Sequence, residues 1–101
     1  MKTSEFLISN TPKLHMLLDS NKLATHNPEL LGELDGLVDY ISSIAPATRE
    51  YGESLLKLAD RYYGVDAHHL DETERAELEK SMRTKIHLIA TRSATYARNG
   101  D

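Results

Sequence analysis

The residues of this sequence best suited to chemistry are neighbouring histidines and carboxylates in one short acidic segment. They are Asp66, His68, His69, Asp71 and Glu72. Imidazole and carboxylate together form a ligand set for transition metals. Adjacent histidines seldom direct both rings at one ion, however, and no downstream His-x-x-x-His pair completes a site. We interpret the segment as a solvated turn that caps a helix, and we expect no metal site.

No other residue pattern in the sequence indicates an active site. The remaining histidines, His15, His26 and His87, are dispersed, and no Ser/His/Asp or Cys/His nucleophile signature accompanies them. Acids at helical spacing, such as Glu50 and Glu53, are equally typical of a solvated helix face. The five glycines lack the spacing of a phosphate-binding loop. The sequence therefore predicts neither an enzyme nor a cofactor site.

Length and composition indicate one folded domain. The chain has 101 residues, of which 40% are hydrophobic and 28% charged, as is typical of a globular protein. It has no cysteine, and no apolar run reaches the roughly 18 residues that a membrane span needs. We expect a single soluble helical domain over residues 1–101, located in the cytoplasm. The formal net charge of -4 disfavours a surface devoted to nucleic acid.

The first predicted element is a short helix. Thr11 followed by Pro12 is typical of a helix start, which predicts a helix over about residues 12–24. Its inward positions would be Leu14, Leu17, Leu18 and Leu23. Residues 1–10, which are apolar at positions 6 to 8, are predicted either as a turn of helix or as a flexible docking arm.

A second helix is predicted to begin at Asn27 and Pro28. Its apolar positions recur at spacings of three and four, at Leu30, Leu34, Leu37, Ile41 and Ile44. Pro46 interrupts it, and an interior proline costs about 3 kcal/mol. The spacing nevertheless continues without a slip to Tyr62, which favours one helix over about residues 28–63, kinked near Pro46. A true break there would instead give a compact four-helix domain.

A third helix completes the pattern. Gly64 is typical of a helix end in the left-handed conformation, with Val65 buried behind it. Asp71 and Glu74 have the capping-box spacing, which predicts a helix over about residues 72–98. Its inward face would be Leu78, Met82, Ile86, Ile89, Ser93 and Tyr96. Because residues 64–71 form a short connector, the second and third helices are predicted to be antiparallel neighbours.

The charge distribution supports this hairpin. Residues 78–101 hold five basic and two acidic side chains, whereas residues 1–77 hold seven basic and fourteen acidic ones. Antiparallel packing would place the basic third helix beside the acidic start of the second, at Glu29, Glu33, Asp35 and Asp39. The sequence thus predicts an all-α fold, a small helical bundle built on a long antiparallel hairpin with a short N-terminal helix.

The predicted hairpin leaves further apolar residues without cover. They are Leu31, Val38, Leu56, Tyr63 and Leu88. Ala45, Gly52 and Ala59, spaced seven apart, would allow close helix approach on that side. Two interpretations stay open: these residues belong to the monomer's core, or they form a surface on which a homodimer or a protein partner completes the bundle.

Two functional hypotheses follow. The first is a small helical protein–protein interaction module, a regulator, adaptor or inhibitor that acts as a homodimer or with a protein partner. The alternative is a nucleic-acid-binding regulator that uses basic residues of the third helix. These are Lys80, Arg83, Lys85, Arg92 and Arg98. We prefer the first hypothesis, because they form no dense stripe and the helix dipole favours basic charge at a C-terminus in any case.

Residues 49–62 resemble the first long helix of F-BAR membrane-bending domains in a Glu-Tyr pair followed by spaced leucines. Those domains are far longer and carry a basic membrane-binding face. Since this chain is acidic, we infer no membrane binding from the resemblance.

Overall fold

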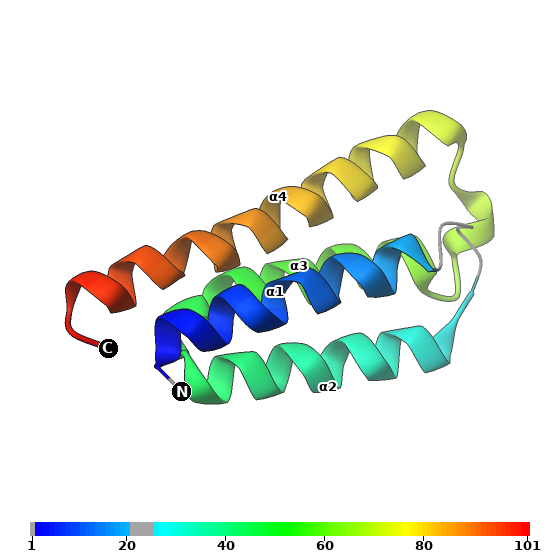
Figure 1. The fold of residues 1–101 in the computed structure, drawn as a ribbon. Helices are drawn as coiled ribbons and strands as arrows, with labels where there is room; N and C mark the ends of the chain where they lie inside the picture. Colours follow the sequence, from blue (N-terminus) through cyan, green and yellow to red (C-terminus); the bar gives the residue numbers. More distant parts are fainter. Residues whose placement is uncertain (1, 21–25) are drawn as a thin grey trace.

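In the computed structural model, which describes residues 2–20 and 26–101, the chain forms a bundle of α-helices (Figure 1). They are α1 (Thr3–Asp19), α2 (Pro28–Ile44), α3 (Arg49–Tyr63) and α4 (Glu72–Arg98). Two 3-10 turns, η1 (Pro46–Thr48) and η2 (Ala67–His69), precede α3 and α4. No strand occurs in the described residues, so the all-α prediction is confirmed.

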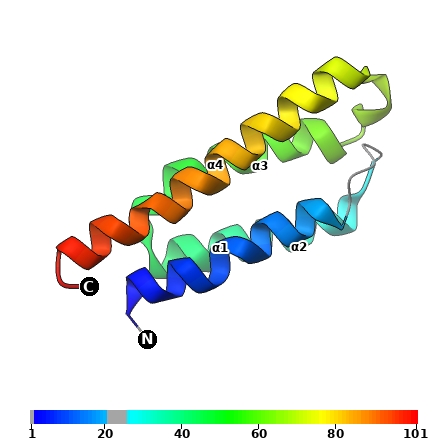
Figure 2. The ribbon, with the colours of Figure 1, turned by 45° about the horizontal axis from the view of Figure 1, so that its top comes forward.

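The helices alternate in direction, and each packs on two neighbours. Helix α1 packs on α2 and α4, and so does α3, while in the described residues the backbones of α1 and α3, and of α2 and α4, lie farther apart on the diagonals of the bundle. Figure 2 shows α1 and α2 on one side of the bundle and α3 and α4 on the other. The contacts of α4 with α1 and α3 are the most extensive, and those between α1 and α2 are the least.

One apolar core runs along the bundle and receives side chains from all four helices. Its largest fully enclosed members are Leu7, Leu14, Leu18, Leu34, Ile41, Leu55, Tyr63, Met82, Ile86 and Ile89. The inward face predicted for α4 is confirmed at Leu78, Met82, Ile86 and Ile89, whereas Ser93 and Tyr96 are half-buried. Removing these apolar side chains from water is the main favourable contribution to folding.

The first helix starts nine residues earlier than the proline signal predicts. Residues 3–10, for which an arm was one of two expectations, belong to α1, and Pro12 lies inside the helix. Phe6 and Leu7 are buried in the core, and their burial offsets the backbone hydrogen bond that an interior proline loses. The predicted bounds of 12–24 are therefore wrong. Leu14 and Leu18 are core residues as expected, Leu17 is half-buried, and Leu23 lies outside the described residues.

Pro46 ends α2 instead of kinking one long helix. Ala45 leaves the helical conformation with φ -122° and ψ 77°, and Pro46 then begins η1. The Ala45 carbonyl accepts bonds from the Thr48 amide (3.0 Å) and from the Thr48 hydroxyl (2.8 Å), which stabilises the turn. The continuous helix over 28–63 is wrong, and the compact four-helix alternative is correct. The residues that follow Pro46 regain the earlier phase because both helices face the same core.

The break also changes which residues of α2 point inward. Leu37 is only half-buried and Ile44 is 39% exposed, while Val38 and Ala45 are 6% and 0% exposed. A Cβ atom added to Gly52 of α3 would lie 2.7 Å from the Val38 Cγ1 atom. The missing side chain of Gly52 therefore lets α2 and α3 approach closely, with Val38 turned inward. Ala45, Gly52 and Ala59 all serve the core of the monomer.

The starts of α2 and α4 follow the local sequence, whereas the end of α3 does not. The Asn27 side chain accepts a bond from the Leu30 amide, and Asp71 forms a capping box with Glu74, as predicted. Gly64, however, is extended at φ -80° and ψ -170°, and Val65 is 70% exposed. A Cβ atom at position 64 would lie 2.0 Å from the Asp60 carbonyl oxygen, so close approach to α3, not a left-handed turn, requires glycine there.

The end of the chain caps the start of α1. Gly100, at φ 82°, turns the backbone after α4, and the Asp101 amide donates to the Tyr96 carbonyl at 2.7 Å. The Asp101 carboxylate then accepts hydrogen bonds from the Ser4 amide and hydroxyl, both at 2.7 Å. These two bonds lower the pKa of Asp101. Figure 1 shows the two termini at the same end of the bundle.

Candidate interaction surface

The seam between α1 and α2 carries an apolar strip that is open to solvent. The strip consists of Met16, Leu17, Leu37, Tyr40 and Ile44. Met16 is 63% exposed, Tyr40 is 51% exposed and Ile44 is 39% exposed. Five large apolar side chains of the described residues are exposed to at least this degree, and three of them lie in this strip. The strip is thus the main apolar surface of the molecule's described part.

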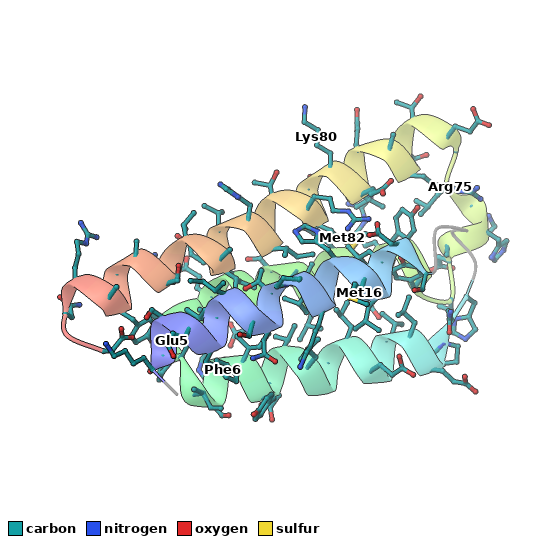
Figure 3. All side chains as sticks on the ribbon, in the orientation of Figure 1. Glu5, Phe6, Met16, Arg75, Lys80 and Met82 are labelled. Atoms are coloured by element: carbon teal, nitrogen blue, oxygen red, sulfur yellow. The ribbon has the colours of Figure 1, made fainter. Side chains whose placement is uncertain are left out.

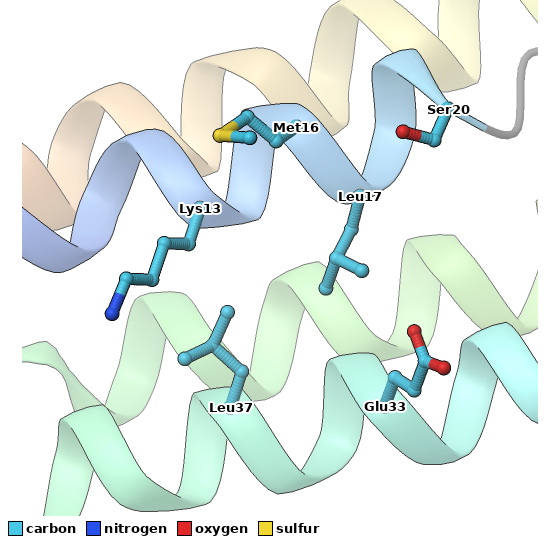
Figure 4. A pocket seen from close by; sticks show the side chains of 6 residues that line it. All are labelled: Lys13, Met16, Leu17, Ser20, Glu33 and Leu37. Atoms are coloured by element: carbon cyan, nitrogen blue, oxygen red, sulfur yellow. The ribbon is translucent and has the colours of Figure 1, made fainter.

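A shallow groove runs between the two helices at the Met16, Leu17 and Leu37 end of the strip. It has a volume of about 390 Å³ and is lined by Lys13, Met16, Leu17, Ser20, Glu33 and Leu37. Figure 4 shows Leu17 pointing from α1 toward α2 and Leu37 pointing back toward α1. At the end near the start of α1, the Phe6 and Tyr40 rings meet edge to face with their centroids 5.3 Å apart. The groove exists because α1 and α2 make the least contact of the four seams.

Spacing explains why α2 presents this strip. Residues three and four apart share one face of a helix. Leu37, Tyr40 and Ile44 have these spacings and form a stripe next to the core stripe that contains Leu34 and Val38. Sequence reasoning assigned Leu37 and Ile44 to the core and did not single out Tyr40 or Met16. The second apolar stripe of α2 is the sequence signal of this surface, although it does not say which of the two stripes is buried.

The exposed surface of α2 is acidic, and Glu33 lines the groove. All four acidic side chains of α2 are exposed: Glu29, Glu33, Asp35 and Asp39. No lysine or arginine occurs between positions 26 and 48. The ion pairs within the described part of the chain both involve Arg83, which contacts Asp19 and Glu79, so neither reaches α2. Across the groove on α1, the Lys13 ammonium group donates to the Asn10 side chain at 3.1 Å.

The predicted pairing of these acids with the basic residues of α4 is wrong. Helix α4 packs on α1 and α3, and in the described residues its backbone does not come close to that of α2. The prediction assumed that α2 and α3 form one arm, which would bring the start of α2 beside the end of α4. Because the chain reverses at Pro46, α2 and α4 lie diagonally across the bundle. The negative charge of α2 is consequently not compensated by α4.

The apolar residues predicted from sequence as an interaction surface do not lie together. Val38 and Tyr63 are 6% and 1% exposed, so they belong to the core, and burial raises the pKa of Tyr63. Leu31 and Leu56 are half-buried and line a second groove, of about 360 Å³, between α2 and α3. Leu88 is half-buried on α4, which lies diagonally across the bundle from α2.

The predicted basic face of α4 is also divided. The Arg83 guanidinium turns toward α1, where it donates to the His15 carbonyl at 3.2 Å and to Asp19. Arg92 turns toward α3, donates to the Tyr51 hydroxyl at 2.9 Å and lies 5.0 Å from the centroid of that ring. The other three residues, Lys80, Lys85 and Arg98, make no ion pair within the described ranges. Figure 3 shows Lys80 pointing away from the bundle.

The histidines lie in two places: His15 and His87 line one pocket between α1 and α4, and His26, His68 and His69 lie at the end of the bundle. His15 lies 2.9 Å from Arg83, measured from Nδ1 to Nη1, and burial together with the Arg83 charge lowers the pKa of His15. His26 and His69 line a pocket of about 420 Å³ with Asp60, Arg61 and Glu74 at the end of the bundle. The His68 and His69 rings are exposed and 3.9 Å apart. Among the described residues, no three metal-binding side chains are close enough to hold one ion.

Comparisons with known proteins give no relative for this chain. No family model, no curated protein and no solved structure matches it. In the described residues, no helix has the length and apolar character to span a membrane.

Proposed function

We propose that this chain is a small helical protein-interaction module, a regulator, adaptor or inhibitor that binds a protein partner on the apolar strip of α1 and α2. The exposure of Met16, Tyr40 and Ile44 on one seam is the observation that carries this proposal. Covering apolar surface is favourable by about 25 cal/mol per Å², so a partner helix laid along the strip gains free energy that this monomer leaves unused.

The strip has the dimensions of a site for one helix. Helices α1 and α2 contain 17 residues each, which corresponds to a length of about 25 Å for either wall. Helix-in-groove recognition uses a few apolar anchors at spacings of three and four. Leu17 and Leu37 form a floor for such anchors, and Met16 on the wall has the flexible side chain that suits an adaptable contact.

The proposed surface replaces the one expected from sequence. The earlier hypothesis relied on Val38 and Tyr63, which the monomer already buries. The reason for expecting a homodimer is also largely removed. The additional apolar residues of the predicted 28–63 helix are mostly buried in the four-helix core of the monomer. The proposal of a protein partner is supported instead by the exposed stripe at Tyr40 and Ile44.

Site-specific photocrosslinking in cells that produce the protein tests the proposal. A photoreactive phenylalanine replaces Met16 or Tyr40 on the strip, and Lys80 or Thr91 on the exposed face of α4 in the matched controls. We expect one specific crosslinked protein from both strip positions and none of that species from α4. The crosslinks to the partner should disappear when Leu37→Glu is added to the strip variants, since a buried charge on the floor of the groove opposes docking.

Two results would contradict the proposal. One is a partner that crosslinks from Lys80 or Thr91 but not from the strip. The other is the absence of any specific crosslink from Met16 and Tyr40 while circular dichroism shows that these variants are folded.

A further inference from the structure

The groove between α1 and α2 has two rims of different charge. On the α2 side, Glu33 lines the groove and Glu29 lies one turn earlier on the same face. On the α1 side the charged residue is Lys13. Among the described residues, an occupant of this groove therefore meets an apolar floor, a negative rim and the positive charge of Lys13 opposite.

From this arrangement we infer that the occupant of the strip is a basic amphipathic helix of another protein. This inference rests on the proposed function, and it specifies the chemistry of the partner. Its apolar residues lie on Leu17 and Leu37, its lysines or arginines face Glu29 and Glu33, and an acidic or neutral residue faces Lys13. Exposed charges of this kind select the partner and its orientation more than they raise affinity.

The absence of neighbouring cations on α2 carries the argument. Residues 26–48 contain four acidic side chains and no lysine or arginine, and α4 lies on the opposite corner of the bundle. Within the described residues, no ion pair involves any of these four acids. Lys57 of α3 lines the other groove beside Asp35, whereas Glu29 and Glu33 face the strip. The potential of these two acids extends into solvent and attracts a positively charged partner over a Debye length of about 8 Å at physiological ionic strength.

The same charges argue against a second copy of this chain as the occupant. Face-to-face docking of two strips would bring two α2 helices together, each with four acids and no lysine or arginine. Each protein also carries a net charge of -4. One Lys13 on each copy does not balance this repulsion. A basic partner would be attracted by these acids, whereas a second copy of the chain would be repelled by them.

Designed peptides provide the probe. The first is an 18-residue helix of leucine and lysine with leucines on one face, the second has glutamate in place of every lysine, and the third has the composition of the first with its leucines scrambled. Affinities for the full-length protein are measured by fluorescence anisotropy, and the site is mapped by NMR chemical shifts. We expect the basic peptide to bind roughly tenfold more tightly than the acidic one and to shift Met16, Leu37 and Tyr40.

Two charge-reversal variants separate the rim from the overall charge. Glu29→Lys with Glu33→Lys reverses the rim of the groove, while Asp35→Lys with Asp39→Lys makes the same net change on the α3 side of α2, where Asp35 lines the other groove. The rim variant should equalise or invert the preference between the basic and acidic peptides. The control variant should keep most of it. Raising the salt concentration from 50 to 500 mM should lower the affinity of the basic peptide until it approaches that of the acidic peptide.

Each contrary result has a distinct meaning. Equal binding of basic and acidic peptides on the strip overturns the inference about charge and leaves the proposed docking surface intact. Binding of the basic peptide that maps to Asp35 and Asp39, or equal binding of the scrambled peptide, overturns the inference as well. A dimer in light scattering that shields Met16 and Tyr40 identifies a second copy as the occupant. No binding by any peptide to a monomer, combined with no crosslink from the strip, overturns both proposals.

Discussion

Helix α1 takes part in two seams that are built from similar residues and behave differently. Toward α4, its leucines are enclosed, and Arg83 ties the two helices together through Asp19 and His15. Toward α2, Leu17 and Leu37 are only half-buried, Met16 is exposed, and no described ion pair crosses the seam. The first seam stabilises the fold, and the second leaves apolar surface exposed to solvent.

The comparison shows that residue type does not separate buried core from exposed surface. Leucine and methionine occur in both seams, and the extent of contact with the neighbouring helix differs. Contact between two helices stabilises the fold where both sides exclude water. Variants that exchange the same residue type in the two seams therefore test the distinction directly.

The largest contrast is expected between two methionines. Met82 on α4 is fully buried and Met16 on α1 is 63% exposed, and Figure 3 labels both. Met82→Ala removes core volume and should lower the free energy of unfolding by about 2–5 kcal/mol. Met16→Ala should change it by less than about 0.5 kcal/mol. Urea unfolding followed by circular dichroism measures both, and a loss above about 1.5 kcal/mol for Met16→Ala would show that the strip is part of the core.

A smaller contrast is expected between two glycines. Gly52 on α3 faces Val38 across the α2/α3 seam, where a new Cβ atom would lie 2.7 Å from the valine Cγ1 atom, whereas Gly32 on α2 has no neighbouring atom within 4 Å of such a Cβ. Gly52→Ala should lower the free energy of unfolding by about 1–3 kcal/mol, because Val38 is stiff and enclosed. Gly32→Ala should raise it by about 0.5–1 kcal/mol.

Thermal unfolding of the two alanine variants checks this contrast. If Gly52→Ala were as stable as Gly32→Ala, close approach at Val38 would not be what sets the rotation of α2. That rotation matters for the proposed function, because it is what carries Tyr40 and Ile44 out of the core.

Local signals in the sequence predicted much of the fold. The capping box at Asp71, the cap at Asn27 and the unbroken pattern of α4 were sufficient, because each depends on residues a few positions apart. The start of α1 was predicted wrongly, since Pro12 outweighed the burial of Phe6 and Leu7, which only the tertiary fold supplies. Local preference is easily overridden in this way.

The candidate surface could not be predicted for a related reason. Assigning Leu37 and Ile44 inward required one continuous helix across Pro46, and the choice between them and Val38 depends on Gly52, fourteen residues away from Val38. The predicted pairing of the acids of α2 with the basic residues of α4 was wrong for the same reason, because it required α2 and α4 to be neighbours. A pattern of period three and four specifies a helix, but a helix with two apolar stripes does not say which stripe is buried.

The smallest expected effect concerns His15, in the α1/α4 seam. Burial first, and then the Arg83 charge, lower its pKa below the ordinary 6.5, while Asp19 raises it and His87 lowers it slightly. Arg83→Gln removes one lowering cause and leaves burial, so the pKa of His15 should rise partway toward 6.5. Lys80→Gln, on the exposed face of the same helix, should not change it. NMR titration of the His15 ring protons measures these values.

The same pKa determines a pH dependence of stability. A histidine whose pKa is lower in the folded state than in the unfolded state binds fewer protons when folded, so its contribution to stability is present above pH 6.5 and declines as the pH falls below it. The free energy of unfolding should therefore decrease from pH 7 toward pH 5, and His15→Gln should make this decrease smaller. An unchanged slope in His15→Gln would mean that His15 titrates equally in both states and that the α1/α4 seam does not hold it neutral.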